Sequence, residues 1–354
     1  MTKIKVMVVD DSAFMRKMIS AMLEDDPRIE IAATARNGKD ALDKIKVHHP
    51  DVITLDVEMP VLDGLSTLQE IMAADPVPVV MLSSQTTAGA DSTIKAINLG
   101  AVDFLSKPSG AISLNIETIK REFIEKVVMA SKANIQPLVR SPLLEEDIPL
   151  KKPNKSAHKT PRRKIVAIGT STGGPRALQE VLTTLPKDFP APILIVQHMP
   201  AGFTQSLARR LDTLSAIKVK EAEDGEWIEN STAYIAPGDY HLTIHNKPGD
   251  RLAVKLHQSE RVKGHRPSVD VMLESLGSQS AYIPIVVIMT GMGADGTKGL
   301  KILKNVYPET TAIIEAKETA VVFGMPNAVI KENLADEIAP VGNIGAVMQV
   351  HAGV

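Results

Sequence analysis

Short apolar runs alternate with amphipathic stretches over the first 131 residues. The runs predict strands at Lys5–Val9, Ile29–Thr34, Asp51–Leu55, Val77–Leu82 and Ala101–Leu105. Between and after these runs, apolar residues recur with helical spacing, which predicts helices at Ala13–Leu23, Lys39–Lys46, Leu65–Ala73, Ser92–Leu99 and about Glu117–Ser131. Regular alternation of strand and helix is typical of an α/β fold, so we expect a doubly wound parallel sheet of five strands.

A second α/β pattern follows residue 163. Strands are predicted at Lys164–Ile168, Pro192–Gln197, Ala233–Ala236, Leu252–Leu256, Pro284–Met289 and Thr311–Glu315. Helical patterns follow the first, second and fifth of these strands, at Arg176–Leu185, Thr204–Leu214 and Thr297–Val306. The pattern indicates a mostly parallel sheet with hairpin material near residues 233–256.

A change in composition separates the two patterns. Residues 134–163 hold five prolines, seven Lys or Arg, three acids and no glycine. Proline-rich charged sequence resists packing, and thirty residues is long for a structureless loop inside one domain. We therefore expect a first domain over residues 1–131, a linker over 132–163 and a second domain over 164–354.

Composition excludes several classes of protein. The formal net charge is −2, so no bulk attraction to nucleic acid or anionic membrane follows. There is no cysteine, which excludes disulfides, cysteine-bound metals and a thiol nucleophile. The short apolar run at the start meets Asp10 too soon for a signal peptide, and no apolar stretch is long enough to cross a bilayer. We expect a cytoplasmic protein that is not inserted in a membrane.

Polar residues end the predicted strands of the first domain. Asp10 and Asp11 follow the first strand, Asp56 the third, Ser83 the fourth and Lys107 the fifth. Parallel strands bring their carboxyl ends to one edge, where three carboxylates repel one another unless a cation neutralises them. Mg²⁺ prefers such oxygen ligands and serves phosphoryl chemistry. Asp56 would then be the nucleophile that forms an acyl phosphate.

These positions carry a family resemblance. Residues 4–131 resemble a two-component receiver domain of flavodoxin-like fold, through the stretches Val8–Ser12, Leu55–Gly64, Ser83 and Lys107-Pro108. The resemblance implies that Asp10, Asp11 and Asp56 hold Mg²⁺ and that Asp56 takes phosphate from a histidine kinase. It also implies that Ser83 and Phe104, with Lys107, are the switch residues that report phosphorylation.

The second domain opens with a glycine-rich turn. Gly169–Pro175 follows the first predicted strand and reads as Gly-x-Ser-x-Gly, the pattern of a nucleophile elbow centred on Ser171. The amide donors and the helix dipole at such a turn favour developing negative charge. A glycine-rich phosphate-binding turn is the alternative that this motif alone leaves open.

A nucleophilic serine needs a base and an acid that orients it. His198 follows the predicted strand Pro192–Gln197, and Asp295 lies in a glycine-flanked turn after Pro284–Met289. Because all three residues follow separate strands of one sheet, a Ser–His–Asp constellation is the favoured interpretation. The chain order Ser, His, Asp differs from that of the α/β-hydrolases and therefore argues against that fold.

Two other groups are weaker candidates. His241 and His245 have the spacing of zinc ligands, but the residues between them read as strand, and we do not expect a metal there. A basic loop contains Arg261, Lys263, His265 and Arg266. We expect it to be either a solvated surface or a rim that attracts an acidic substrate.

The motifs of this half resemble the catalytic domain of the chemotaxis protein-glutamate methylesterases. The matching stretches are Gly169–Pro175, Gln197–Pro200, Ala236–Asp239, His265–Asp270 and Gly291–Gly296, within a resemblance over residues 164–350. It implies hydrolysis of glutamate methyl esters, and deamidation of certain glutamines, on methyl-accepting chemoreceptors.

The resemblance also implies roles for single residues. Ser171 would attack, His198 would move the proton and Asp295 would orient His198. The backbone amides of Met292 and Thr172 would form the oxyanion hole, with no cofactor in this domain. The receiver would cover the site until Asp56 is phosphorylated.

Three other functions compete with the esterase interpretation. The second domain could bind DNA, bind a nucleotide through Gly169–Gly174, or act as a silent adaptor. Near-neutral charge and the absence of a helix-turn-helix pattern argue against DNA, and we expect no nucleic-acid partner.

Overall fold

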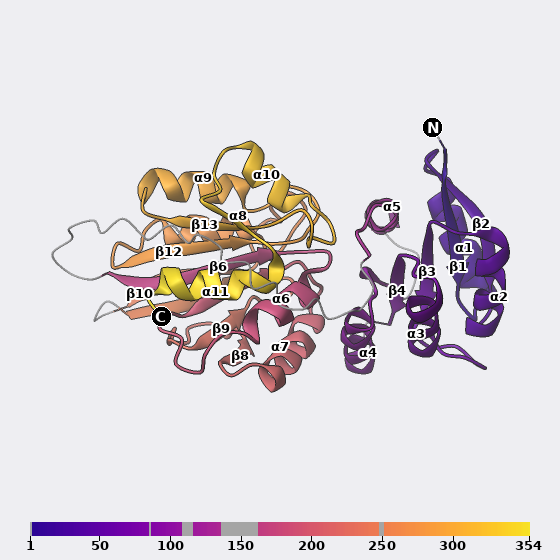
Figure 1. Ribbon diagram of the computed structural model, residues 1–354, viewed down its shortest axis with the longest axis horizontal. Coiled ribbons are helices and arrows are strands. Elements are labelled where there is room, and N and C mark those ends of the chain that lie inside the picture. Colours follow the sequence, from indigo (N-terminus) through magenta and orange to yellow (C-terminus); the bar gives the residue numbers. More distant parts are fainter. Residues whose placement is uncertain (1, 85, 108–115, 136–161, 248–250) are drawn as a thin grey trace. The chain divides into compact units, whose positions relative to one another are not determined.

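The computed structural model describes residues 2–84, 86–107, 116–135, 162–247 and 251–354. The chain divides into two compact units, Met1–Arg140 and Ser141–Val354 (Figure 1). Most of the predicted linker, residues 136–161, lies outside the described residues, as does Pro108. Each unit is described by itself below.

The first unit is built around a five-stranded parallel sheet in the order β2-β1-β3-β4-β5. Its strands are β1 (Ile4–Val9), β2 (Ile29–Ala35), β3 (Val52–Asp56), β4 (Val79–Ser83) and β5 (Asp103–Ser106). Its helices are α1 (Ala13–Glu24), α2 (Gly38–His48), α3 (Gly64–Ala74), α4 (Thr87–Asn98) and α5 (Ile116–Ala130). The prediction of a doubly wound parallel sheet is confirmed.

Helix starts in this unit follow from side-chain caps. Ser12, Asn37 and Asp63 each accept a hydrogen bond from a backbone N–H in the first turn of α1, α2 and α3. The α4 helix begins at residue 87, five residues before the predicted start at Ser92. The reason is Thr86, whose side chain accepts from the Gly89 N–H and caps an apolar-poor first turn that periodicity does not detect.

The second unit contains a seven-stranded parallel sheet in the order β14-β13-β12-β6-β7-β9-β8. Its strands are β6 (Arg163–Thr170), β7 (Ile193–Gln197), β8 (Lys218–Glu221), β9 (Thr232–Ile235), β12 (Tyr282–Ile288), β13 (Thr311–Glu315) and β14 (Glu337–Ala339). An antiparallel hairpin is formed by β10 (His241–Lys247) and β11 (Arg251–His257). The predicted α/β class and mostly parallel sheet are confirmed, and the hairpin falls where it was expected.

Helices cover both faces of this sheet. They are α6 (Gly174–Leu182), α7 (Phe203–Leu214), α8 (Val269–Leu276), α9 (Thr297–Val306), α10 (Met325–Lys331) and α11 (Val341–Ala352). One core is formed by α8, α9, α10 and the hairpin against alternate residues of the central strands, such as Ile165, Ala167 and Val286. The opposite face is covered by α6, α7 and α11, with α6 packed against both of the others.

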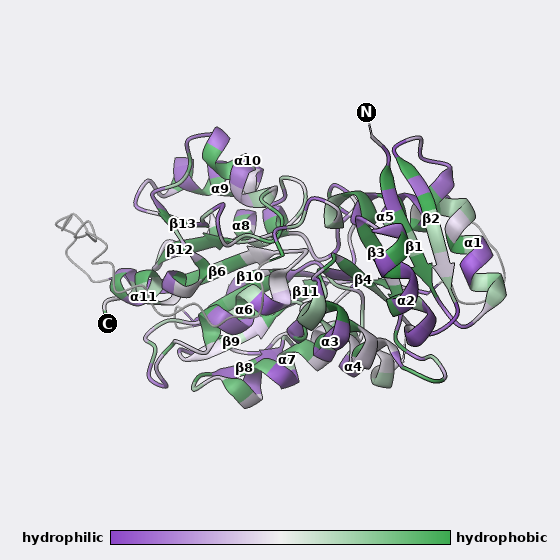
Figure 2. Cartoon of the chain, turned by 45° about the vertical axis from the view of Figure 1, so that its right-hand side comes forward, coloured by the Kyte–Doolittle hydropathy of each residue, from purple (hydrophilic) through white to green (hydrophobic). Residues whose placement is uncertain are grey.

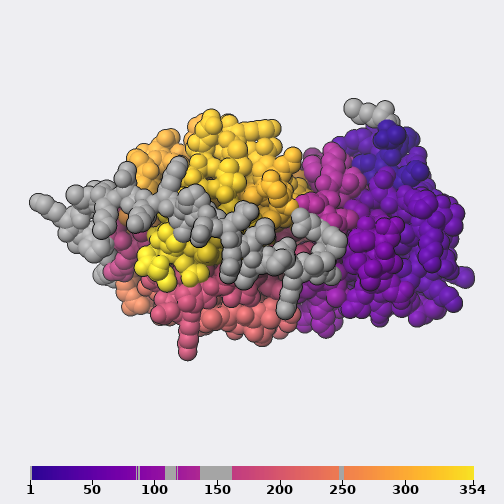
Figure 3. Space-filling model, in the orientation of Figure 1, coloured from indigo at the N-terminus to yellow at the C-terminus, as the bar shows by residue number. Residues whose placement is uncertain are grey.

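Burial on both faces explains the apolar strands. Figure 2 shows the sheet strands as mainly hydrophobic, and Val166, Ala167 and Ile168 of β6 are all fully buried. In Figure 3 the last residues of the chain, in yellow, lie at the surface of the second unit. Over the described ranges, no helix combines the length and the apolar character that a membrane span requires.

Candidate active site and phosphoacceptor cluster

Three adjacent central strands of the second unit carry the predicted triad. Ser171 follows β6, His198 follows the neighbouring β7, and Asp295 lies in the turn after β12 on the other side. Because β6 is the first strand and its two neighbours come later from opposite directions, this is the topological switch point of the sheet. The sequence-predicted residues are therefore brought to one edge.

A direct side-chain contact joins His198 to Asp295. His198 Nε2 lies 2.9 Å from Asp295 Oδ2, and both side chains are nearly fully buried. Asp295 Oδ2 also accepts from the Val269 N–H at 2.7 Å. Its Oδ1 accepts from Ser268 Oγ at 2.9 Å and from the Asp270 N–H at 3.1 Å. The carboxylate thus sits at the amino end of α8, which the helix dipole favours.

These donors keep Asp295 ionised. Burial alone would raise the pKa of its carboxyl, but the hydrogen bond and charge of His198, with the Val269 and Asp270 amides, outweigh burial. The pKa of Asp295 is consequently held well below its usual range. An ionised carboxylate only accepts, so Nε2 of His198 carries a hydrogen, and in the neutral form of the ring the free electron pair lies on Nδ1.

The other surroundings of His198 leave Nδ1 open. Nδ1 is buried and has no hydrogen-bond partner among the described residues, and Ser171 Oγ forms no hydrogen bond with the ring there. The His265 ring stacks on the His198 ring, with centroids 3.9 Å apart and planes 5° from parallel. The His198 ring is thus held by Asp295 at one nitrogen and by His265 on one face.

The turn that carries Ser171 is held by hydrogen bonds to the Ser171 backbone. The Ser171 N–H donates to the Thr290 carbonyl at 3.0 Å, and the Ser171 carbonyl accepts from Gln197 Nε2 at 3.0 Å. Gly291 lies so close that a Cβ on it would stand 2.8 Å from Ser171 Cβ. The predicted strand-to-helix turn is present, but the residue with positive φ is Gly173, at 78°, and not Ser171.

The two predicted oxyanion donors lie on loops beside this serine. Thr172 is next to Ser171, and Met292 lies in the turn between β12 and Asp295. Within the described ranges, the Met292 N–H donates no hydrogen bond. An oxyanion donor needs an N–H group that is free of other hydrogen bonds before the substrate binds.

The first unit brings its predicted acidic residues together. Asp10, Asp11 and Asp56 each offer an oxygen within 4.8 Å of the others. Lys107 Nζ lies 2.9 Å from Asp10 Oδ2 and 2.7 Å from Asp56 Oδ2. Burial raises the pKa of Asp56 to about 6, against the opposing effect of Lys107. Two buried carboxylates and an exposed one offer the oxygen ligands that a hard divalent cation prefers, with the Lys107 ammonium beside them.

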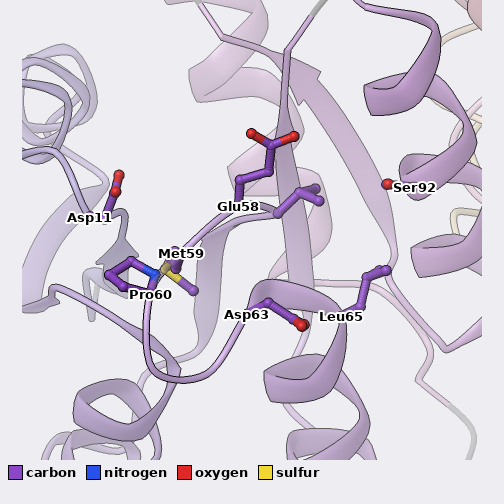
Figure 4. Close-up of a pocket in the computed structure, with 8 residues that line it drawn as sticks. Asp11, Glu58, Met59, Pro60, Asp63, Leu65 and Ser92 are labelled. Carbon is purple, nitrogen blue, oxygen red and sulfur yellow. The ribbon is translucent and has the colours of Figure 1, made fainter.

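Two predicted switch residues lie deeper in the first unit. Ser83 is 1% exposed at the end of β4, and its Oγ donates to the Gly89 carbonyl at 3.0 Å. Phe104 is buried in β5, with Lys126 Nζ 5.1 Å from its ring centroid. Figure 4 shows a pocket that is lined by Asp11 after β1 and by Glu58 and Met59 after β3.

The basic loop is less free than the sequence indicates. Arg261 and Arg266 both contact Asp239 Oδ1, at 2.6 and 2.8 Å. Lys263 Nζ contacts Asp270 Oδ2 at 2.8 Å. These ion pairs neutralise the loop from within, because each cation has an acidic partner of the same unit. His241, the weak metal candidate, is fully buried in β10 and its Nε2 lies 3.1 Å from a backbone carbonyl.

Comparison with known proteins identifies both units. Residues 166–348 match the family model described as CheB methylesterase, and residues 6–117 match the response regulator receiver domain. The chain belongs to the CheB methylesterase family. A Geobacillus kaustophilus relative named protein-glutamate methylesterase/protein-glutamine glutaminase is 56% identical over 346 residues, 98% of each chain. The Bacillus subtilis relative of the same name is 48% identical over 354 residues, 97% of each chain.

A solved structure of this family agrees with the second unit. The Thermotoga maritima CheB methylesterase catalytic domain is 49% identical to this chain, with a TM-score of 0.50. The match covers 53% of this chain and 97% of that domain. Family membership favours the esterase interpretation over the nucleotide- and nucleic-acid-binding alternatives.

Several residues that hold the site were missed by the sequence analysis. Ser268 was named only within a motif, although a serine before an apolar run is a helix N-cap signal. Glu315 ends a predicted strand and could have been found by the rule that singled out Asp56. Thr290 lies between β12 and the Gly291 turn and carries no signal by itself.

Proposed function

We propose that this protein is a phosphorylation-activated hydrolase of methyl-accepting chemoreceptors. It converts glutamate γ-methyl esters into glutamate and methanol, and specific glutamines into glutamate and ammonia. Methyl groups on receptors set their signalling state, so the reaction provides adaptation in bacterial chemotaxis. The observation that carries the proposal is the buried His198–Asp295 pair, at 2.9 Å, on the strand ends that flank the Ser171 turn.

The first half of the reaction forms an acyl-enzyme. Ser171 Oγ attacks the γ-carbonyl carbon while His198 takes the serine proton at Nδ1. Asp295 holds the Nε2–H and stabilises the imidazolium that forms. The backbone N–H groups of Met292 and Thr172 receive the developing negative charge on the carbonyl oxygen.

The second half releases products. The proton on His198 Nδ1 passes to the leaving methoxide or amide nitrogen, giving methanol or ammonia. Water then attacks the acyl carbon and gives one proton to His198, which returns it to Ser171 Oγ as the ester bond breaks and glutamate is released. The net reaction consumes one water per ester. The catalytic unit needs no cofactor for this chemistry.

The receiver unit supplies the control. Asp10, Asp11 and Asp56 would hold Mg²⁺, which would supply positive charge to neutralise phosphoryl oxygens during transfer. Asp56 takes the phosphoryl group from the chemotaxis histidine kinase. Lys107 contacts its oxygens, and Ser83 and Phe104 change position in response. Before phosphorylation the receiver restrains the esterase.

The remaining parts of the proposal concern organisation and location. The receiver domain comprises residues 1–131, the linker 132–163 and the catalytic domain 164–354. The protein works in the cytoplasm, without nucleic-acid partners and without membrane insertion.

The test is methanol release from methylated receptor membranes, measured with Mg²⁺ and a small-molecule phosphodonor. The wild-type chain should release methanol and Ser171→Ala should release none above the buffer rate, with an unchanged circular dichroism spectrum. Equal release by the two proteins would refute Ser171 as the nucleophile.

A further inference from the structure

Glu315 is a buried acid that the proposed mechanism does not use. It is the last residue of β13 and its side chain is only 1% exposed. A buried carboxyl is unfavourable unless hydrogen-bonded. In the described part of the chain no Lys, Arg or His pairs with it, and the charge that acts on it is the negative one of Glu180 on α6. An ion pair therefore does not explain why this carboxyl is buried.

Both oxygens of Glu315 accept hydrogen bonds from neighbouring loops. Oε2 accepts from the Thr290 N–H at 2.7 Å, and Oε1 accepts from Thr319 Oγ1 at 3.0 Å. Thr319 Oγ1 in turn accepts from the Val341 N–H at 3.0 Å. One side chain thus ties together the loops after β12 and β13 and the start of α11.

Thr290 passes this restraint to the nucleophile turn. Its carbonyl accepts from the Ser171 N–H and from Thr170 Oγ1, both at 3.0 Å. Its hydroxyl donates to the Thr172 carbonyl at 2.9 Å and accepts from the Val322 N–H at 3.0 Å. An unbroken series of hydrogen bonds therefore runs from Glu315 through Thr290 to both sides of Ser171.

We propose that Glu315 is a positioning residue of the esterase site, which sets the Ser171 turn by holding the Thr290 N–H. This inference rests on the proposed function of that site. Without the acceptor, Thr290 would keep a buried, unsatisfied N–H, and the loop would shift to satisfy it. The shift would move the Thr290 carbonyl, and with it the Ser171 amide. A displacement of about 1 Å in such a site lowers turnover roughly 100-fold.

The reach of the side chain, rather than its charge, is the property required. Burial raises the pKa of Glu315 to about 7, the Thr290 and Thr319 donors oppose this, and Glu180 adds to it. A neutral side chain of equal length can therefore replace it. Glu315→Gln keeps an oxygen for the Thr290 N–H and offers an amide N–H to Thr319 Oγ1. Glu315→Asp keeps the carboxyl but withdraws it by one methylene.

The experiment compares these two variants in the full-length protein. The rate of Ser171 labelling by a fluorophosphonate, and kcat and KM for methanol release, are measured with Mg²⁺ and phosphodonor. We expect Glu315→Gln within about threefold of wild type. We expect Glu315→Asp to lose at least about tenfold in labelling rate and kcat, with KM unchanged.

Asp336→Asn is the matched control. Asp336 Oδ2 accepts from the Ala312 N–H at 2.7 Å, so it anchors the opposite end of the same strand. This variant should keep the wild-type kcat whatever stability it loses. Circular dichroism and urea unfolding give the folded fraction for every variant.

Three outcomes separate the possibilities. A folded Glu315→Asp with wild-type labelling and kcat would overturn the positioning role. So would an equal loss of kcat in Asp336→Asn, because the effect would then be general loosening of β13. Absence of methanol release by the wild-type chain would instead refute the proposed function.

Discussion

Replacing Asp295 with asparagine tests the His198 tautomer most sharply. Four donors converge on the two carboxylate oxygens from outside the Asp295 turn: His198 Nε2 and the Val269 N–H on Oδ2, Ser268 Oγ and the Asp270 N–H on Oδ1. An asparagine must place its NH₂ group on one side. Either choice sets a donor against a backbone N–H that cannot turn away.

The orientation of the asparagine amide decides how catalysis is impaired. With NH₂ in the Oδ2 position, His198 Nε2 has to accept a hydrogen bond, and the ring proton moves to Nδ1. A protonated Nδ1 cannot take the proton of Ser171 Oγ. With NH₂ in the Oδ1 position, the tautomer is kept but the charge that stabilises the imidazolium is lost. In a well-studied serine protease the corresponding change lowers turnover about 10⁴-fold, equivalent to about 5.4 kcal/mol of activation free energy. We expect a loss of about 10³–10⁴ in kcat with little change in KM.

Stability must be separated from this effect. An unsatisfied backbone N–H costs about 1–3 kcal/mol, so Asp295→Asn should also unfold at lower urea concentration. Asp270→Asn is the control, because its carboxylate caps α9 through the Gly296 and Gly299 N–H groups at 2.9 and 2.7 Å without touching His198. It should lose similar stability and far less turnover. A folded Asp295→Asn within tenfold of the wild-type kcat would refute the assignment of Asp295.

Three further predictions concern other parts of the chain. Asp56→Asn should hydrolyse receptor esters at the unphosphorylated rate and show no response to Mg²⁺ and phosphodonor in the methanol assay; a full response would contradict the phosphoacceptor assignment. Gly291→Ala should lower kcat while circular dichroism stays native, because its Cβ would stand 2.8 Å from Ser171 Cβ; unchanged kcat would contradict that close approach. Burial raises the pKa of Glu315 from 4.5 to about 7 in the folded protein, so the wild type loses folding stability as pH rises through this range. Urea unfolding should therefore show that the stability of Glu315→Gln rises relative to wild type between pH 4.5 and 7, to a difference of about 3 kcal/mol at pH 8. A stability difference that does not depend on pH would contradict this prediction.

Periodicity and strand-end chemistry predicted the architecture because both depend on local sequence. Buried parallel strands such as β6 and β12 are nearly continuous apolar runs, and the polar residues that follow them converge on one edge. That rule placed Asp10 with Asp56 in the first unit, and Ser171, His198 and the Asp295 turn together in the second. Short elements were missed: β14 has only three residues, and α8 has eight and follows a proline-containing loop.

The hydrogen bonds and ring contacts inside the site could not be predicted from local sequence. The set of four hydrogen bonds that reach the Asp295 carboxylate from outside its own turn depends on α8 and His198 meeting the turn after β12, and these parts are distant in sequence. The same holds for the stack of His265 on His198 and for the chain from Glu315 to Thr290. The ion pairs of the basic loop were beyond local sequence for the same reason. Its charge could be counted, but its partners Asp239 and Asp270 are set by tertiary packing.

The central claim is that a serine esterase is held in check by its own receiver. The most direct measurement compares methanol release by three samples: a fragment beginning at Lys164, the full-length chain, and the full-length chain with Mg²⁺ and phosphodonor. The account predicts that the fragment works without phosphodonor, faster than the unphosphorylated full-length chain, and that phosphodonor raises the full-length rate. A fragment that is folded by circular dichroism, yet no faster than the unphosphorylated full-length chain, would contradict the inhibitory role of the receiver.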